Sequence, residues 1–309
     1  MLPSVPQLRY FLAVAEEGQF TRAAERLQVA QPSVSAQIRR LESMLRTELF
    51  HRGPGPVTLT DAGAALLPIA RRVVADLASI DDELSGLDAL LRGHVAVGAT
   101  PSLSATLLPS VLGRFHRLYP GVVIRVSEQG SPQLLEELLG GTLDLALAIA
   151  PVSSRGLASV PLAEEELVVV TPPDHLLSAR RSITVPELAG HPLVMFRPGY
   201  DLRTATIDAF AAHGVEPTVA VEGGEMGSVL ALVAAGLGAA VVPGIVTSVT
   251  DRLRVTRFKP PAPTRTIALV HRDDRAPSRA AEALATAFTD GIATDGWPGP
   301  MPQGMRLFR

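Results

Sequence analysis

The chain has 309 residues, of which 47 % are hydrophobic, a formal net charge of −3 and no cysteine. This length and hydrophobic content suit two or three folded domains and exclude wholesale disorder, and the missing cysteines exclude disulfides, iron–sulfur clusters and thiol nucleophiles. Because no secretory signal opens the chain and its apolar runs are too short to span a membrane, we expect a cytoplasmic protein.

Residues 1–60 predict three short helices and a hairpin. The first helix ends at Gly18, the second opens with Thr21 as its N-cap, and the third opens at Gln31. The third helix has an apolar stripe for its inner face, made of Val34, Ile38, Leu41 and Leu45. A Gly/Pro turn between extended ends at 51–60 predicts a β-hairpin wing. We therefore interpret residues 1–60 as a winged helix-turn-helix, a domain that binds duplex DNA.

Residues 61–92 predict one long helix with a heptad seam. Apolar residues recur at alternating spacings of four and three, at Leu66, Ala70, Val73, Leu77, Ile80, Leu84, Leu87 and Leu91. A seam of this length needs an apolar partner. We expect pairing with a second copy of the chain, and the alternative is packing against the protein's own body.

Residues 93–290 alternate between strands and helices, which predicts a mostly parallel sheet covered by helices. The segment is long enough for two α/β subdomains, with subdomain I at about 93–162 and 267–290 and subdomain II at about 163–266. Strands are expected near 158–162 and 165–171. Residues 291–309 are rich in glycine and proline and have no helical or strand period, so we expect a flexible tail.

Several motifs in a fixed order match one protein family. They are LRYFLAVAEEGQFTRAAERL at 8–27, AQPSVSAQIRRLE at 30–42, LFHR at 49–52 and LTDAG at 59–63, with weaker matches at 108–109, 119–120, 141–146 and 233–238. Over about residues 5–290 the chain resembles the LysR-type transcriptional regulators. The resemblance implies a winged helix-turn-helix, a linker helix that forms a homodimer, and a periplasmic-binding-protein-like effector domain. It also implies a small-molecule effector between two α/β subdomains and a homotetramer on double-stranded DNA.

In a helix-turn-helix, the recognition helix lies in the major groove with its N-terminal residues near the base edges. The residues that we expect at the DNA are Thr21, Gln31, Pro32, Ser33, Ser35, Ala36, Gln37, Arg39, Arg40, Arg52 and Thr58. Glutamine and serine suit base edges, whereas Arg39, Arg40 and Arg52 suit phosphates. The alternatives are that Thr21 is only a helix cap and that one of Arg39 and Arg40 is a solvated surface charge.

The sequence departs from the family pattern at three places. Position 36 is often arginine in the family and is alanine here, so one DNA contact is missing. Arg46 stands where glycine usually follows the recognition helix, so the helix must end without a left-handed glycine. The wing tip at 53–56 lacks the basic residues that are common there, which predicts a weaker electrostatic grip on the minor groove.

The effector site is expected between the subdomains, beyond the carboxyl ends of strands and beside helix N-termini. The candidates at such places are Thr100, Ser102, Ser131, Ile149, Phe196, Arg197, Arg203 and Met226. Phe196 is expected as a wall, and Arg197 together with the hydroxyls suggests an anion or carboxylate as the effector. The alternative for Arg203 is a helix residue that points to solvent.

The sequence carries no motif of catalysis. It has no Gly-x-Ser-x-Gly, His-Glu-x-x-His or Walker motif, and its seven histidines lack metal-ligand spacing. We therefore expect no enzyme, no metal and no cofactor. Two further alternatives are a solute-binding transport component and a nucleoid-type DNA binder without a ligand. The DNA-binding segment and the missing export signal oppose the first, and the large α/β body opposes the second.

Overall fold

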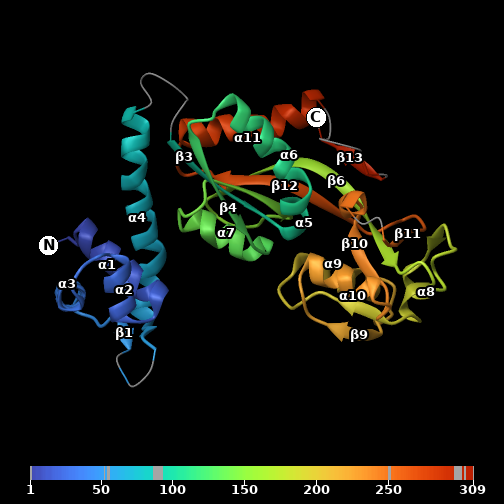
Figure 1. The fold of residues 1–309 in the computed structure, drawn as a ribbon, viewed down its shortest axis with the longest axis horizontal. Coiled ribbons are helices and arrows are strands. Elements are labelled where there is room, and N and C mark those ends of the chain that lie inside the picture. Colours follow the sequence, from blue (N-terminus) through green and yellow to red (C-terminus); the bar gives the residue numbers. More distant parts are fainter. Residues whose placement is uncertain are drawn as a thin grey trace. The chain divides into compact units, whose positions relative to one another are not determined.

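The computed structural model describes residues 2–51, 53, 56–85, 93–249, 252–295, 301–302 and 304–308. The chain divides near residue 88 into two compact units, a helical N-terminal unit and an α/β C-terminal unit (Figure 1). In the described part of the chain, no helix combines the length and the apolar character needed to cross a membrane.

The described part of the N-terminal unit consists of helices and a two-stranded hairpin. In chain order these are α1 (Val5–Glu17), α2 (Phe20–Arg26), α3 (Gln31–Leu45), β1 (Phe50–His51), β2 (Thr58–Leu59) and α4 (Asp61–Ser85). α1 ends at Gly18, whose φ of 63° lies in the left-handed region that glycine adopts without strain. The predicted order of a winged helix-turn-helix is therefore confirmed.

One apolar core holds the N-terminal unit together. The rings of Phe11 and Phe50 are buried in it with their centroids 5.3 Å apart. Three members of the predicted α3 stripe are fully buried: Val34, Ile38 and Leu41. The fourth, Leu45, is 37 % exposed and lies outside the core, because α3 reaches its end there.

Of the two expectations about helix ends, the one about Thr21 needs correction. Thr21 is not the N-cap of α2, because the helix begins one residue earlier, at Phe20. Arg46 ends α3 in the left-handed conformation, with φ of 55°, although it is not glycine. This conformation costs about 1–2 kcal/mol in a non-glycine residue. The N–H groups of Arg46 and Thr47 both donate to the Glu42 carbonyl, which offsets that cost.

α4 uses the first part of the heptad seam within its own unit. Ala70 is fully buried in the N-terminal core, and Leu66 and Val73 pack against that core. Leu77 is 37 % exposed, and the side chains of the seam positions from 80 to 91 lie outside the described residues. For positions 66–73 the structure therefore shows the alternative that the sequence left open, packing against the protein's own body. Three short helices cannot cover their own apolar faces, so α4 completes their core.

The C-terminal unit is an α/β structure with a large sheet and a separate pair of strands, β8 and β9. Its elements in chain order are β3 (Gly93–Ala99), α5 (Pro101–Ala105), α6 (Leu107–Leu118), β4 (Val122–Glu128), α7 (Ser131–Leu139), β5 (Leu145–Ala150), β6 (Leu157–Thr171), β7 (Ser182–Ile183), α8 (Val185–Ala189), β8 (Leu193–Met195), α9 (Asp201–Ala211), β9 (Val219–Glu222), α10 (Met226–Ala234), β10 (Ala240–Pro243), the 3-10 helix η1 (Gly244–Val249), β11 (Arg254–Phe258), β12 (Thr264–Arg272), α11 (Arg279–Asp295) and β13 (Met305–Leu307).

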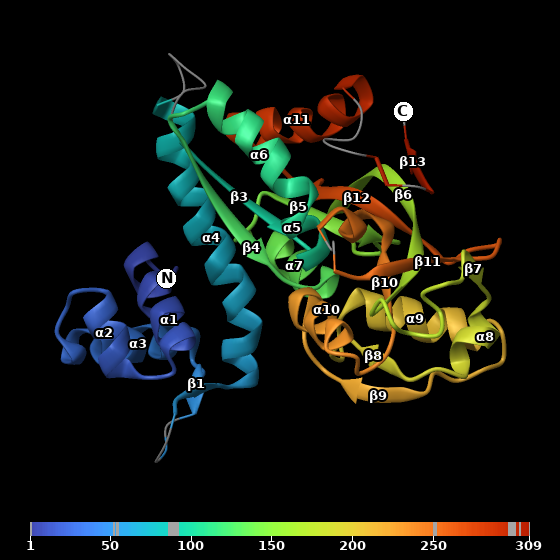
Figure 2. The same cartoon turned by 45° about the vertical axis from the view of Figure 1, so that its right-hand side comes forward.

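The large sheet is mixed, whereas the sequence predicted a mostly parallel one. Its order is β4-β3-β5-β12-β6-β11-β7, and β10 and β13 also pair with β6. β3 runs parallel to β4 and β5, but β12 and β6 run antiparallel to all their neighbours because they carry the chain between the two halves. We call the half with β3–β5, α5–α7 and α11 lobe I, and the half with β7–β11 and α8–α10 lobe II (Figure 2).

β6 is one continuous strand where two strands were expected. Its first part pairs with β12, and its last part pairs with β10 and β11. Pro161 lies within it and has no N–H to donate, and the register with β12 shifts beside it, between Ile267 and Ala268. This irregularity lets the strand continue past the proline, so β6 belongs to both lobes.

Alternation along the strands of lobe I positions the helices on either face of the sheet. Leu145 and Leu147 of β5 join the cluster that contains Phe115 of α6 and Phe288 of α11. Ala146, between those two leucines, joins the cluster on the opposite face, which α7 covers. The helix N-termini that follow β3 and β4 therefore lie at the carboxyl ends of these parallel strands.

The expected flexible tail at 291–309 is partly ordered. α11 continues to Asp295, and β13 pairs antiparallel with β6, with Met305 opposite Glu165. Met305 is buried, and Arg306 donates to Glu164 at 2.9 Å. Apart from β13, only β12 among the described strands pairs with β6 at 163–165, so one edge of the strand would be open there. An open strand edge favours the addition of another strand, which explains why the expectation failed.

Candidate DNA-binding and effector sites

α3 presents polar residues on the face away from the core. The expected contact residues that are exposed are Gln31, Pro32, Ser33, Ala36, Arg39 and Arg40, and those that are half-buried are Ser35 and Gln37. The amide of Gln31 donates to the Ser35 hydroxyl at 2.9 Å, so the first turn carries a small connected group of uncharged donors and acceptors. Such groups match the hydrogen-bonding edges of bases.

The second half of α3 carries cations for which the described residues supply no acidic partner. A pocket of about 720 Å³ is lined by Gln7, Arg39, Arg40, Ser43, Met44 and Arg46. Among the described residues, no ion pair reaches Arg39, Arg40 or Arg46, whereas Arg26 of α2 lies 2.6 Å from Glu16. Unpaired guanidinium groups beside a recognition helix are the groups that neutralise backbone phosphates.

The remaining expected DNA contacts lie around α3. Thr21 is exposed on the first turn of α2, and Thr58 is exposed in β2. Arg52 in the wing lies outside the described residues. Thr58 pairs across the hairpin with His51, which places both residues at the base of the wing.

In lobe I, four expected effector residues lie around the ends of β3, β4 and β5. Thr100 precedes α5 and is buried, and its Oγ1 finds no hydrogen-bond partner among the residues that the structure describes. Ser102 is buried, and its hydroxyl accepts from Arg265 Nη2 at 2.9 Å. Ser131 opens α7, and its hydroxyl accepts from the Ile149 N–H at 3.0 Å. The structure therefore connects Ser131 and Ile149 directly.

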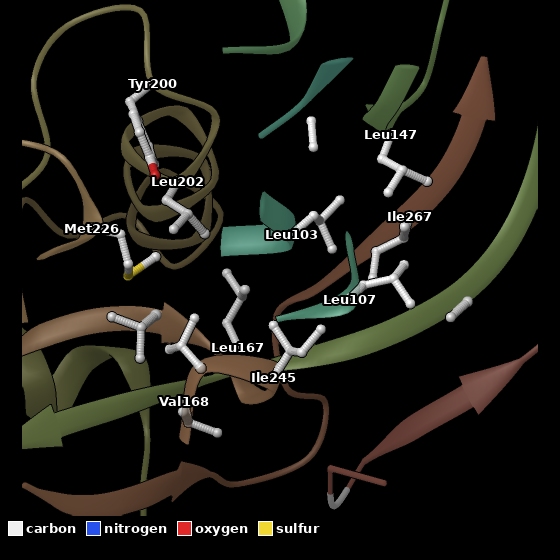
Figure 3. Close-up of a cluster of buried hydrophobic side chains, with 14 of the residues drawn as sticks. Leu103, Leu107, Leu147, Leu167, Val168, Tyr200, Leu202, Met226, Ile245 and Ile267 are labelled. Atoms are coloured by element: carbon white, nitrogen blue, oxygen red, sulfur yellow. The ribbon is translucent and has the colours of Figure 1, made fainter. Parts of the chain in front are cut away.

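In lobe II, apolar side chains form a wall. The Phe196 ring is buried and stacks on Tyr200 with their centroids 4.8 Å apart. Met226 opens α10 and is buried in one cluster with Leu202 of lobe II and Leu103 of lobe I (Figure 3). The two lobes therefore share a continuous apolar contact beside the hydroxyls of lobe I.

Both expected cations of lobe II have acidic partners. Arg197 donates to Glu225 through Nε at 3.1 Å and Nη2 at 3.0 Å. Arg203 lies 3.0 Å from Glu222 and also donates to the Phe196 carbonyl at 3.0 Å. Arg203 is therefore held by Glu222 and by the Phe196 carbonyl, with its side chain 22 % exposed.

Sequence reasoning missed Asp201, which joins the lobes. Its Oδ2 accepts from the Ser131 N–H at 3.2 Å and from the Ser131 hydroxyl at 2.9 Å. Asp201 is the first residue of α9 and Ser131 the first of α7, so the carboxylate lies at two helix N-termini. The backbones also meet, because a Cβ on Gly130 would lie 3.0 Å from the Gly199 carbonyl oxygen. An acidic residue at a helix start was visible in the sequence, but its partner was not.

Sequence reasoning also missed a buried ion pair between the two strands that connect the lobes. Arg265 of β12 donates to Glu165 of β6 at 2.9 Å and 2.7 Å, and their side chains are only 3 % and 1 % exposed. The second carboxylate oxygen of Glu165 accepts from the Ile245 N–H at 2.9 Å. The available signal was an arginine that precedes the apolar run Ile267–Val270 in the same strand.

Comparisons with known proteins agree with this arrangement. Residues 5–64 match the family described as "Bacterial regulatory helix-turn-helix protein, lysR family", and residues 88–293 match the "LysR substrate binding domain". A probable hydrogen peroxide-inducible genes activator of Streptomyces viridosporus is 34 % identical over 297 residues, which cover 94 % of this chain and 95 % of that protein. The structure of a full-length OxyR variant from Pseudomonas aeruginosa is similar with a TM-score of 0.74 and 26 % identity, covering 98 % of this chain and 100 % of that one. Full-length CbnR complexed with its target DNA is similar with a TM-score of 0.69 and 26 % identity, covering 92 % and 98 %.

The two family matches fall on the two units that the fold separates, the helix-turn-helix and the two-lobed α/β unit. Proteins of this family bind DNA and small-molecule effectors, form oligomers and are not enzymes. The chain belongs to the LysR family and is a LysR-type DNA-binding transcription regulator with an effector-binding domain.

Proposed function

We propose that this regulator binds a dyad-symmetric DNA site as a dimer and that a small molecule between its lobes changes DNA binding or promoter activation. The observation that carries the proposal is the division of α3 into an uncharged first turn and a second half with unpaired arginines. A dimer places two such helices in successive major grooves. An effector that binds one lobe arrangement better than another shifts the relative placement of the two helices.

Within this proposal, each expected DNA contact has a distinct role. Base reading belongs to Gln31, Ser33, Ser35 and Gln37, with Pro32 and Ala36 as apolar contacts. Phosphate binding belongs to Arg39, Arg40 and Arg52, with Thr21 and Thr58 at the backbone. Arg46 lines the same pocket as Arg39 and Arg40, so we add it to the residues proposed to bind phosphates.

Operator titrations at several salt concentrations test these roles, after the DNA that co-purifies with the protein has been sequenced. We expect Arg40→Ala to weaken binding to all sequences and to reduce the slope of log K against log salt by about 0.9. Ser33→Ala should instead relax base preference, by about 1–3 kcal/mol at one position. Arg117→Ala, an exposed arginine of α6, is the control. An unchanged salt slope in Arg39→Ala and Arg40→Ala would refute the phosphate assignment.

The dimer is proposed to form through the part of α4 beyond Val73, and a tetramer through further pairing of the effector domains. Positions 66–73 of the seam are used within the N-terminal unit, while Leu77 is exposed. Sedimentation velocity tests this proposal. Leu77→Glu should reduce the assembled mass, whereas Ile69→Glu, also exposed on α4 but off the seam, should not. A Leu77→Glu variant with the wild-type mass would contradict it.

The effector is proposed to act by binding and not by thiol oxidation. The Streptomyces relative carries the name of a hydrogen peroxide-inducible genes activator, but this chain contains no cysteine. We assign the effector site to the residues that meet at the lobe junction, namely Thr100, Ser102, Ser131, Ile149, Phe196 and Met226. Arg197, on which the expectation of an anionic effector rested, is neutralised by Glu225.

A further inference from the structure

The arginines near the lobe junction are already paired with carboxylates. Among the described residues there, each arginine has a carboxylate partner, in the pairs Arg197–Glu225, Arg203–Glu222 and Arg265–Glu165. An anionic effector would have to displace a carboxylate from one of these pairs or remain beside it. Both arrangements are unfavourable, because like charges in contact repel and a displaced carboxylate, of which only Glu165 is buried, loses its partner.

The group at the junction best suited to hold an anion is occupied by the protein itself. The Ser131 N–H and hydroxyl, at the N-terminus of the nine-residue helix α7, both donate to Asp201 Oδ2. Two donors at a helix N-terminus are what a ligand carboxylate would use. Asp201 reaches them from the opposite lobe, so its carboxylate takes the position of a ligand anion.

Two hydroxyls at the junction have no partner. Within the described part of the chain, Thr100 Oγ1 and the Tyr200 hydroxyl are each buried without a hydrogen bond, and both residues are 3 % exposed. Burial raises the pKa of Tyr200, and the nearby carboxylates of Glu225 and Asp201 raise it further against the charge of Arg265. Both hydroxyls are therefore neutral at physiological pH and can donate or accept. Buried polar groups are nearly always paired, so these two point to a polar partner.

We propose that Asp201 is a built-in anion of the effector site, and that the site accepts uncharged, hydrogen-bonding molecules and rejects carboxylates. This inference rests on the proposed placement of the effector between the lobes. Thr100 and Tyr200 supply hydrogen bonds to such a molecule, and the apolar wall of Phe196 and Met226 supplies contact area. Asp201 excludes anions by occupying their donors and by its own charge.

Chemical rescue of the full chain tests the proposal with acetate as the probe. Asp201→Ala frees the Ser131 donors, so acetate should raise the Tm of this variant saturably, by about 3 °C at ten times its Kd, relative to chloride at equal ionic strength. Wild type and Asp208→Ala, which removes an exposed carboxylate from the same helix, should show no such rise, and acetamide, which lacks the charge, should stabilise Asp201→Ala less than acetate does. Stabilisation of wild type by acetate, or no rescue of Asp201→Ala, overturns the proposal.

A second variant covers the case in which Asp201→Ala does not fold. Asp201→Asn keeps the side-chain volume and loses the charge, so amide hydrogen exchange in the first turn of α7 should become several-fold faster, and an unchanged rate overturns the proposal. DNA titrations on the same proteins separate this inference from the proposed function. Failure of wild type to bind any DNA refutes the proposed function, while the acetate results still decide whether Asp201 fills an anion site.

Discussion

Replacing Arg265 by methionine tests the ion pair that connects the two crossover strands. Arg265 donates two hydrogen bonds to Glu165 and one to Ser102, and both charged side chains are almost completely buried. Removing one partner leaves the other charge buried and unpaired, which costs about 3–5 kcal/mol. We therefore expect Arg265→Met to lower the opening free energy of β6 and β12 by about 4 kcal/mol.

A double variant shows whether the pair acts as a unit. When Glu165 is also replaced by leucine, no buried charge remains, and the main loss is the acceptor of the Ile245 N–H. That loss costs about 1–3 kcal/mol, so the double variant should be more stable than Arg265→Met alone. Such a result is possible only if the cost of the single variant comes from the unpaired carboxylate.

Hydrogen exchange with mass spectrometry, on peptides that cover β6 and β12, measures these free energies without assuming that the two units unfold together. The control is Arg306→Met. This variant removes the ion-pair partner of Glu164, which lies next to Glu165 in β6. Arg306 is 71 % exposed, so this variant should cost at most about 1 kcal/mol. If Arg265→Met costs no more than the control, or if the double variant is the less stable one, the reasoning is refuted.

Three further predictions concern lobe II and the C-terminal strand. Thr184→Ala breaks the capping box that begins α8 and holds the pKa of Glu187 at about 2, and thermal unfolding should show a loss of about 1 kcal/mol that Thr184→Ser avoids. Burial and a neighbouring histidine lower the pKa of His175, so the unfolded chain binds a proton at this histidine more readily than the folded chain does. The Tm should therefore fall as the pH drops below about 6.5, and the fall should be smaller in His175→Asn. Gly304→Val places a side chain on a residue with φ of 78° and against Glu166, so β13 should detach from β6. The Glu166 N–H, which donates to the Gly304 carbonyl, should then exchange its hydrogen faster, and an unchanged exchange rate would contradict the pairing.

The parts of the fold that the sequence predicted are those whose signal is local. Helix periods, the glycine at position 18 and the Gly/Pro turn each act within a few residues, and they give the order of the winged helix-turn-helix. The direction of β6 and β12 depends on how the chain crosses between lobes, so a parallel sheet was expected where a mixed one exists. β13 has only three residues, too few to carry a period.

The effector site divides in the same way. Hydroxyls after strands and before helices could be placed from the βα alternation, and Thr100, Ser102 and Ser131 all lie at such ends. Their partners could not, because Asp201 is 70 residues from Ser131 and Arg265 is 163 residues from Ser102. Arg197 shows the consequence: its charge was visible in the sequence, but its neutralisation by Glu225 depends on tertiary structure.

The heptad seam of α4 shows what a period establishes about function. A 3.5-residue repeat indicates that one face of a helix is buried, but it does not show whether a partner chain or the helix's own unit covers that face. Here Ala70 and Val73 share the core that also holds Phe11 of α1 and Ile38 of α3. Because packed cores transmit displacement instead of absorbing it, a change in the proposed pairing of α4 beyond Val73 would move α1 and α3 with it. The recognition helix is therefore placed by α4 directly, and this rigid connection is what a change in the geometry of the dimer would act on.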